Sequence, residues 1–471
     1  MTDQPTVYVE TYGCQMNVSD SELMLGKLVA SGYRPVDGPD GADVILVNTC
    51  AIRDHAEQRV IGRLGELKRH MAPGAILGVT GCMAQRLGPV LLERASHVSL
   101  VIGPDGYRAL PALLDGARRG IRATATEFDL EEHYEDFSPR RIDGVKAWIP
   151  VQRGCDYRCT YCIVPTTRGP ERSRRLADVV REVESVVAEG MTEVVLLGQT
   201  VNSYHDGEHD FADLLRAVGG VPGIRRVRFT SPHPNDFSDR VISALAEVPA
   251  VCEHVHLPMQ SGSTRILKRM LRRYSREGYL ECVARLRGAI PGLALTTDVI
   301  VGFPGETDDD FEETLAVVRE VGFEDAYTFK FSPRDGTAAT RFPVGETVSD
   351  DVASERLARL IETVRGASRR RNLGLLGTEH EVLAERVAKR GEGEIQARTR
   401  DFKTVVLRSG AAVLGGYYRV KITGTTGSTF TGEIVGATRA LPVSVTHQVS
   451  PLGGLGGNNF FPPAPEGEAV V

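Results

Sequence analysis

Three cysteines with the spacing C-x3-C-x2-C constrain this chain more than any other feature. Cys155, Cys159 and Cys162, here called the central triplet, lie within one short segment. Thiolates held this close together suit an iron-sulfur cluster, and three ligands leave one iron of a [4Fe-4S] cluster without a protein ligand. A substrate or cofactor can bind to that iron. The segment therefore predicts a cluster with an open coordination position.

A zinc site and a set of buried core cysteines are the alternatives for this segment. A closed structural zinc site normally has a fourth Cys or His ligand nearby. The first histidine after Cys162 is His205, which lies much farther along the chain. The zinc interpretation is therefore disfavoured.

Three further cysteines lie far apart in the first hundred residues. Cys14, Cys50 and Cys82, the N-terminal triplet, each follow an apolar, β-branched run that predicts a buried strand, and each precedes a helical pattern. The expected strands cover residues 7–11, 44–47 and 76–80. Because the carboxyl ends of parallel strands line one crevice, these cysteines can converge and hold a second cluster.

Two shorter predictions concern this part of the chain and the remaining cysteines. A helix is expected over residues 19–30, where Ser19 and Glu22 have the spacing of a capping box. Cys252 and Cys282, the last two of the 8 cysteines, fit neither triplet. Free Cys is among the most buried residue types, so we predict that both are core residues.

Length and composition favour a cytoplasmic enzyme with several domains. The 471 residues suffice for two to four domains. No stretch approaches the ~20 apolar residues that cross a bilayer, and the first residues lack the features of a signal peptide. In the reducing cytoplasm, clustered cysteines bind metals sooner than they form disulfides. Because the net charge is -6, any RNA contact must come from local basic patches.

Strand and helix patterns divide the chain into three folded regions. Residues 5–121 predict a small doubly wound α/β domain, and residues 122–143, acidic and then basic, are expected to be a linker. The alternation resumes over residues 144–372 and predicts a full or partial parallel (β/α)6 barrel. Its six expected strands cover residues 147–152, 194–198, 227–231, 254–258, 294–301 and 326–331. The central triplet follows the first strand, at the end where such barrels have their active sites.

Small and polar residues stand at the ends of the later barrel strands. They are Gly198, Gln199, Ser231 and Gln260, and Asp298 begins a further segment, residues 298–307, that spans the fifth strand and its end. Glycine lets a ligand approach the backbone, and Gln, Ser and Asp side chains can bond to amino, carboxyl or ribose groups. The segment Gly302-Phe303-Pro304-Gly305 is by itself typical of a turn. Its position at a strand end after a cluster motif favours a cofactor contact.

Residues 373–437 change to short β-prone runs with Gly-rich turns, which predict a small OB-like β-barrel. Basic residues crowd this region and alternate with aromatic ones. Basic side chains neutralise phosphates and aromatic faces stack with bases, so we predict an RNA-binding surface at Arg398, Arg400 and Lys403. The alternative is a solvated charged surface. The tail, residues 438–471, has no sustained period and is expected to be disordered.

The order of these regions resembles the methylthiotransferases of the radical S-adenosylmethionine (SAM) superfamily. The resemblance covers residues 5–437 and rests on Thr11-Tyr12-Gly13-Cys14-Gln15-Met16-Asn17 and on the segment 153–174. Both segments look most like the branch that modifies N6-isopentenyladenosine in tRNA. Sister branches act on threonylcarbamoyladenosine in tRNA or on an aspartate of a ribosomal protein, and they stay open as alternatives.

The resemblance implies the cofactors and the reaction. A [4Fe-4S] cluster on the central triplet would bind SAM and cleave it reductively, with Tyr161 and the five strand-end residues named above in contact with SAM. A second [4Fe-4S] cluster on the N-terminal triplet would present the sulfur, and a further SAM would supply the methyl group. Carbon 2 of adenine is unreactive toward ordinary acid-base chemistry. The cofactors would therefore carry the chemistry, and no side chain beyond the cluster ligands is expected to be catalytic.

The resemblance also implies partners and a TRAM-type RNA-binding role for the C-terminal barrel. The expected partners are a tRNA anticodon stem-loop, an electron donor such as flavodoxin or ferredoxin, and proteins that deliver sulfur and iron-sulfur clusters. A monomer without membrane contact is expected. A different class of function, an iron-sulfur RNA-binding or electron-transfer protein without SAM chemistry, is disfavoured because a carrier needs no cofactor pocket at the strand ends.

Overall fold

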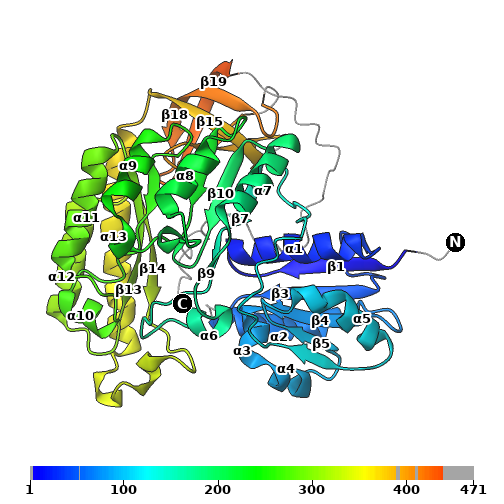
Figure 1. The fold of residues 1–471 in the computed structure, drawn as a ribbon. Coiled ribbons are helices and arrows are strands. Elements are labelled where there is room, and N and C mark those ends of the chain that lie inside the picture. The colour runs from blue at the N-terminus through cyan, green and yellow to red at the C-terminus, as the bar shows by residue number, and fades with distance from the viewer. Residues whose placement is uncertain (1–3, 52–53, 389–392, 409–411, 439–471) are drawn as a thin grey trace.

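The computed structural model describes residues 4–51, 54–388, 393–408 and 412–438. The tail from residue 439, which we predict to be disordered, lies outside these ranges. Within them, no helix is both long enough and apolar enough to span a membrane. The chain forms an N-terminal sheet with its helices, a central half-open barrel and a small C-terminal barrel (Figure 1).

The N-terminal region is a parallel sheet with the strand order β2-β1-β3-β4-β5-β6. Its strands are β1 (Thr6–Thr11), β2 (Arg34–Pro35), β3 (Val44–Thr49), β4 (Ile76–Gly81), β5 (Leu100–Ile102) and β6 (Ala123–Ala125). The central strands are uniformly buried because helices cover both faces, as the apolar runs require. The doubly wound prediction is confirmed. The strand order reverses between β1 and β3, which is where ligand crevices form in such sheets.

Two helical layers cover this sheet. Helices α1 (Gln15–Ala30) and α5 (Leu110–Arg118) pack on one face, and α2 (Asp54–Leu67), α3 (Cys82–Leu87) and α4 (Pro89–Arg94) pack on the other. The start expected for α1 is wrong. Cys14 is the N-cap, and Ser19 and Glu22 lie buried inside the helix. Glu22 instead accepts hydrogen bonds from Ile142 N and Arg141 Nη1, which are tertiary contacts that the capping pattern does not reveal.

The segment between the first two regions is packed rather than extended through solvent. Residues 123–125 of the expected linker form β6, which pairs with β5 at the sheet edge. Farther along, Tyr134, Phe137 and Ile142 pack against the face that carries α1 and α5. Arg141 reaches from Glu22 to Glu182 of the central region. The connection therefore holds the two regions against each other.

The central region is a half-open parallel barrel. Its strands are β7 (Lys146–Pro150), β10 (Glu193–Leu197), β11 (Arg226–Phe229), β12 (His254–His256), β13 (Ala294–Val301) and β14 (Asp325–Lys330), all within two residues of the expected bounds. They form the sheets β11-β10-β7 and β12-β13-β14, which a parallel bridge between Val227 and Val251 joins. The outer helices are α7 (Leu176–Ala188), α8 (Phe211–Gly219), α9 (Asp239–Glu247), α10 (Thr264–Arg269), α11 (Arg276–Ala289), α12 (Asp308–Val321) and α13 (Asp350–Leu373).

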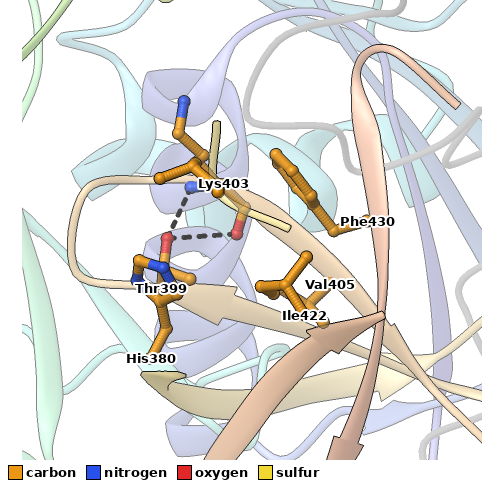
Figure 2. Close-up of a pocket in the computed structure, with 7 residues that line it drawn as sticks. His380, Thr399, Lys403, Val405, Ile422 and Phe430 are labelled. Carbon is orange, nitrogen blue, oxygen red and sulfur yellow. Dashed lines mark hydrogen bonds between the residues drawn. The ribbon is translucent and has the colours of Figure 1, made fainter. Parts of the chain in front are cut away.

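The C-terminal region is a closed barrel in the order β15-β16-β17-β19-β18, which confirms the predicted β-barrel. Its strands are β15 (Glu379–Val387), β16 (Ile395–Thr399), β17 (Thr404–Leu407), β18 (Tyr417–Thr425) and β19 (Thr429–Thr438). Figure 2 shows a small hollow in this barrel between Thr399, Lys403, Val405 and Phe430. The hollow is too narrow to admit a ligand and lies away from both cysteine triplets.

The C-terminal barrel covers the amino-terminal end of the central barrel. Arg226, the first residue of β11, donates to the carbonyl of Arg398 at 2.8 Å. Phe402, with a positive φ of 73°, stacks on His254 at the start of β12 with the ring centroids 4.6 Å apart, and it packs against the apolar cluster that contains Trp148. The opposite, carboxyl-terminal end of the strands is where the central triplet lies.

Candidate iron-sulfur and cofactor site

The N-terminal triplet converges at the carboxyl ends of three adjacent strands. Cys14 follows β1, Cys50 follows β3 and Cys82 follows β4, and the in-register pairs Thr11–Asn48 and Asn48–Thr80 bring these ends level. A hydrogen bond from Cys50 lowers the pKa of Cys14 to about 6 against the opposing effect of burial. Burial raises the pKa of Cys82, and the charge of Cys14 adds to that effect. The three sulfurs therefore share one site.

One glycine and two amides shape the N-terminal site. Gly13 has a φ of 133°, and a Cβ on it would lie 2.6 Å from the Cβ of Cys50, so a larger residue does not fit. Asn17 Nδ2 donates to Asn48 Oδ1 at 3.1 Å, and Asn48 Nδ2 donates to the carbonyl of Asn17 at 2.8 Å. Both amides are fully buried. This exchange joins the first turn of the helix that follows Cys14 to the strand end that precedes Cys50, and sequence analysis did not single it out.

The central triplet lies in the loop between β8 (Gln152–Arg153) and α6 (Val164–Arg168). Cys155 Sγ lies 3.1 Å from Thr200 Oγ1 at the end of β10. Burial raises the pKa of Cys162 to about 12, and the charges of Cys159 and Cys155 add to the shift. Cys162 therefore lies close enough to the other two cysteines for their charges to act on it, as the C-x3-C-x2-C spacing predicts.

Several backbone contacts fix this loop. Gly154 has a φ of 75°, and a Cβ there would lie 1.9 Å from the carbonyl oxygen of Pro170. Its N–H donates to Gln199 Oε1 at 2.6 Å. Thr160 N donates to the carbonyl of Met270, and Thr160 O accepts from Ala339 N. The loop is therefore anchored to three separate parts of the central barrel.

One buried arginine contacts each triplet. Arg168 Nε lies 3.1 Å from Cys82 Sγ, and Arg272 Nη1 lies 3.3 Å from Cys159 Sγ. Hydrogen bonds to cluster sulfurs are a means by which proteins tune such centres. Both arginines stand outside the cysteine motifs, so the spacing of the cysteines gave no sign of them.

The donor set fits two iron-sulfur clusters. Within the residues that the structure describes, no three His, Cys, Asp or Glu side chains form a site for a single metal ion. Three thiols are a suitable ligand set for a four-iron cluster, which is larger than one ion. In the same described part of the chain, the buried Nη1 of Arg168 has no hydrogen-bond partner, and a cluster sulfide is an acceptor for such a donor.

The strand-end residues predicted to contact SAM gather around the carboxyl end of the barrel. Ser231 and Gln260 adopt φ values of 57° and 68°, which are unusual for residues other than glycine and recur at ligand sites. Asp298 Oδ2 lies 3.3 Å from His256 Nε2, and Gln260 N donates to the carbonyl of Asp298 at 2.8 Å. These three remain predicted SAM contacts.

The other three predicted contacts have identifiable structural roles. Gln199 orients the loop of the central triplet through Gly154. Gly198 leaves room for Gln152, whose Oε1 would lie 2.7 Å from a Cβ at that position. Tyr161 packs edge-on against Phe303 with the ring centroids 6.4 Å apart. Their contact with SAM remains a prediction.

An aromatic and acidic group beside the central triplet was missed by sequence analysis. The ring of Tyr157 stacks on His233 with the centroids 3.9 Å apart, and its hydroxyl donates to Asp236 at 2.9 Å. Burial lowers the pKa of His233 to about 2, and Arg272 adds to the shift. His233 is therefore neutral.

Burial also raises the pKa of Glu171, nearby in the chain, to about 7.

The residues predicted to bind RNA lie instead in the contact between the two barrels. Arg398 Nε donates to Glu385 at 3.0 Å, Arg400 Nη2 donates to Glu253 at 2.8 Å, and Lys403 pairs with Glu324. Arg398 is only 4 % exposed. These carboxylates neutralise the cations within the fold, and the contact of the three residues with RNA stays a prediction.

Two family models match the chain. Residues 149–318 match the Radical SAM superfamily, and residues 6–103 match the uncharacterized protein family UPF0004. The first match contains the central triplet and most of the barrel strands. The second contains the N-terminal triplet.

Curated relatives match nearly the whole chain. A tRNA-2-methylthio-N(6)-dimethylallyladenosine synthase of Geobacter sulfurreducens is 44% identical over 442 residues, which are 92% of this chain and 98% of the relative. A protein of the same name from Porphyromonas gingivalis is 42% identical over 442 residues, which are 92% of this chain and 95% of the relative.

Two solved structures share the fold. The radical S-adenosylmethionine methyltransferase TsrM from Kitasatospora setae matches with a TM-score of 0.55 and 16% identity, over 72% of this chain and 74% of that one. The cobalamin-dependent S-adenosylmethionine radical enzyme OxsB matches with a TM-score of 0.52 and 12% identity, over 78% of this chain and 58% of that one. At these identities the likeness concerns the arrangement of domains and strands.

Proposed function

The chain belongs to the family of tRNA-2-methylthio-N(6)-dimethylallyladenosine synthases, and from this premise we propose how its own residues serve that activity. It is a radical SAM methylthiotransferase that converts N6-isopentenyladenosine next to the anticodon of tRNA to the 2-methylthio derivative. At the level of residues, the observation that carries this function is the pair of cysteine triplets, each gathered at strand ends.

The cofactors are SAM and two [4Fe-4S] clusters. We assign one cluster to Cys14, Cys50 and Cys82, and the other to Cys155, Cys159 and Cys162. When bound, these groups supply the radical and sulfur chemistry, including the methyl transfer. The chain's own residues bind the groups, orient them and exclude water.

We assign SAM binding to the carboxyl-terminal end of the barrel. Asp298, held by His256 at 3.3 Å, and Ser231 present acceptors to the amino and ribose groups of SAM. Gln260 is held in place by its backbone bond to Asp298. At the opposite end, Phe402 stacks on His254 and packs against the apolar cluster that contains Trp148, so apolar side chains cover that end of the barrel.

For tRNA we propose a different surface from the one that sequence analysis predicted. Arg419 and Lys421 alternate with buried residues along β18 and point to solvent, and Arg408 is also exposed. Arg419 has an exposed partner, Glu379, at 3.1 Å, which a phosphate can replace at small cost. These residues provide the local positive charge that a chain with a net charge of -6 needs to bind an anticodon stem-loop.

The remaining partners follow from the chemistry. Reductive cleavage of SAM needs a one-electron donor such as flavodoxin or ferredoxin, and replacement of the inserted sulfur needs sulfur and iron-sulfur delivery proteins. We propose that the protein acts in the cytoplasm, where its tRNA substrate resides, and that it acts as a monomer.

Two measurements test the function. tRNA nucleosides from cells with and without this protein should differ in 2-methylthio-N6-isopentenyladenosine by mass spectrometry, and a variant without the central triplet should not restore it. The anaerobically reconstituted, reduced protein should release 5′-deoxyadenosine from SAM. An unchanged nucleoside content would refute the substrate assignment. A reconstituted protein that never cleaves SAM would support the iron-sulfur RNA-binding alternative.

A further inference from the structure

Arg168 connects the central region to the N-terminal triplet. It is the last residue of α6, in the segment that follows the central triplet, and its side chain is 3 % exposed. Its Nε lies 3.1 Å from Cys82 Sγ, and its Nη2 lies 2.7 Å from Asp20 Oδ2. One guanidinium thus contacts both a proposed cluster ligand and a carboxylate of α1.

Asp20 connects the same arginine to the start of the central triplet. Its side chain is fully buried. Arg153 Nη2 lies 3.7 Å from Asp20 Oδ1, and Arg153 directly precedes Gly154 and Cys155. Tyr107 Oη also lies 3.3 Å from Asp20 Oδ2. The carboxylate therefore holds two arginines, one beside each triplet.

Within the part of the chain that the structure describes, several buried polar atoms of Arg168, Asp20 and Arg153 make no hydrogen bond, which indicates that a bound group belongs beside them. Among the described residues, Arg168 Nη1, Asp20 Oδ1, and Arg153 Nε and Nη1 are buried without a hydrogen-bond partner. A buried charged group without a partner costs more free energy than a neutral one. Arg168 Nη1 is a donor on the same guanidinium that already contacts Cys82, so the inorganic sulfide of a cluster on the N-terminal triplet is a suitable acceptor.

We propose that Arg168 and Asp20 form a positioning pair that holds the N-terminal cluster against the central region and sets its reduction potential. The proposal rests on the proposed function, because it requires a cluster on Cys14, Cys50 and Cys82. Reduction adds negative charge to a cluster. A buried cation beside Cys82 stabilises the reduced form and raises the potential, whereas the adjacent carboxylate of Asp20 opposes this effect.

Arg272 provides a matched comparison at the other triplet. Its Nη1 lies 3.3 Å from Cys159 Sγ, and it is 7 % exposed. Its Nε donates to the hydroxyl of Tyr274 at 3.1 Å, where Arg168 contacts a carboxylate. Substitution of Arg272 removes a buried arginine of the same kind without altering the surroundings of Cys82.

The experiment uses the full chain with Cys155, Cys159 and Cys162 replaced by Ala, so that only the N-terminal cluster is observed. Arg168→Gln, Asp20→Asn and Arg272→Gln are introduced separately. Iron and sulfide are counted, and the potential is measured anaerobically by redox titration followed by electron paramagnetic resonance. We expect a more negative potential in Arg168→Gln, a more positive potential in Asp20→Asn, and no change in Arg272→Gln.

The opposite directions distinguish electrostatic tuning from simple loosening of the site. Shifts of the same sign in Arg168→Gln and Asp20→Asn, or no shift in either, would overturn the proposal. If Arg168→Gln holds no iron, Arg168→Lys decides. Arg168→Lys keeps the positive charge, so it should hold the cluster. The proposal would also be overturned if Arg168→Lys held no cluster and the reduction potential of Asp20→Asn were unchanged. Absence of iron from the parent protein would instead refute the two-cluster assignment of the proposed function.

Discussion

The ammonium of Lys146 in β7 lies 3.1 Å from the carboxylate of Glu385 in β15, and both side chains are less than one-tenth exposed. Arg398 contacts the other oxygen of the same carboxylate at 3.0 Å. Burial alone would raise the pKa of Glu385, but the charges of Arg398 and Lys146 hold it well below its usual range. This buried triad joins the C-terminal barrel to the amino-terminal end of the central barrel.

Glu385→Gln should therefore destabilise the protein strongly. It removes the carboxylate that two buried cations share, and breaking a buried ion pair costs about 3–5 kcal/mol. Glu379→Gln is the matched control on the same strand, since its pair with Arg419 is exposed and contributes at most about 1 kcal/mol. Urea unfolding of both variants under anaerobic conditions measures the difference. Equal losses in the two variants would contradict this account of the domain contact.

The salt dependence of tRNA binding should identify the phosphate contacts. Arg419→Ala with Lys421→Ala should weaken binding and make the salt dependence shallower, by about one unit of logarithmic slope for each lost contact. Arg400→Ala is the control, because its guanidinium contacts Glu253. Binding is measured at several salt concentrations. If the salt dependence of binding became shallower in Arg400→Ala but not in the double variant, the surface predicted from sequence would be the one that binds tRNA.

Local patterns in the sequence were sufficient to predict the strands and the positions of the cysteines at their ends. The apolar runs before Cys14, Cys50 and Cys82 form buried parallel strands, and parallel pairing by itself brings their ends together. The short spacing of the central triplet is enough to bring its three cysteines together. In such cases the determining interactions lie within a few residues or follow from the rules of sheet topology.

Other features depend on contacts that are distant in the chain. Arg398 and Arg400 resemble an RNA-binding patch in sequence, but their partners Glu385 and Glu253 are visible only in the fold. Likewise, Asp20 meets Arg168 across 148 residues of sequence. A charge pattern does not indicate whether a carboxylate from another region neutralises it. The sequence therefore shows that Arg398 and Arg400 are basic but does not show that each is paired with a carboxylate.

The two clusters should be separable by substitution. Replacement of Cys155, Cys159 and Cys162 by Ala should leave a protein with one cluster of about four irons. Replacement of Cys14, Cys50 and Cys82 should leave reductive SAM cleavage intact and abolish sulfur attachment, because the N-terminal triplet lies on a separate sheet. Iron and sulfide analysis and 5′-deoxyadenosine formation measure the two effects. Loss of SAM cleavage from a folded protein that retains its central cluster would refute this division.

Glu171 should make stability depend on pH. Burial raises its pKa from 4.5 to about 7, while a hydrogen bond from Ser203 opposes the shift. The folded protein therefore binds this proton more tightly than the unfolded chain, so the stability from Glu171 is full below about pH 4 and is lost as the pH rises toward 7. Between about pH 5 and 8, the Tm of the wild type should fall more steeply with rising pH than the Tm of Glu171→Gln. Parallel curves would show that Glu171 titrates normally.

The enzyme should require the isopentenyl group of its substrate. The target adenosine lies in a single-stranded loop, so it can leave the stack at a lower cost than a paired base. Its isopentenyl group is apolar and gains free energy when it is buried in a hydrophobic pocket. Because one missing apolar group changes binding only modestly, the comparison should use kcat/KM on isopentenylated and unmodified anticodon stem-loops. We expect a clear preference for the isopentenylated stem-loop. Equal values, or a preference for threonylcarbamoyladenosine, would move this chain to a sister branch while the cluster chemistry stayed the same.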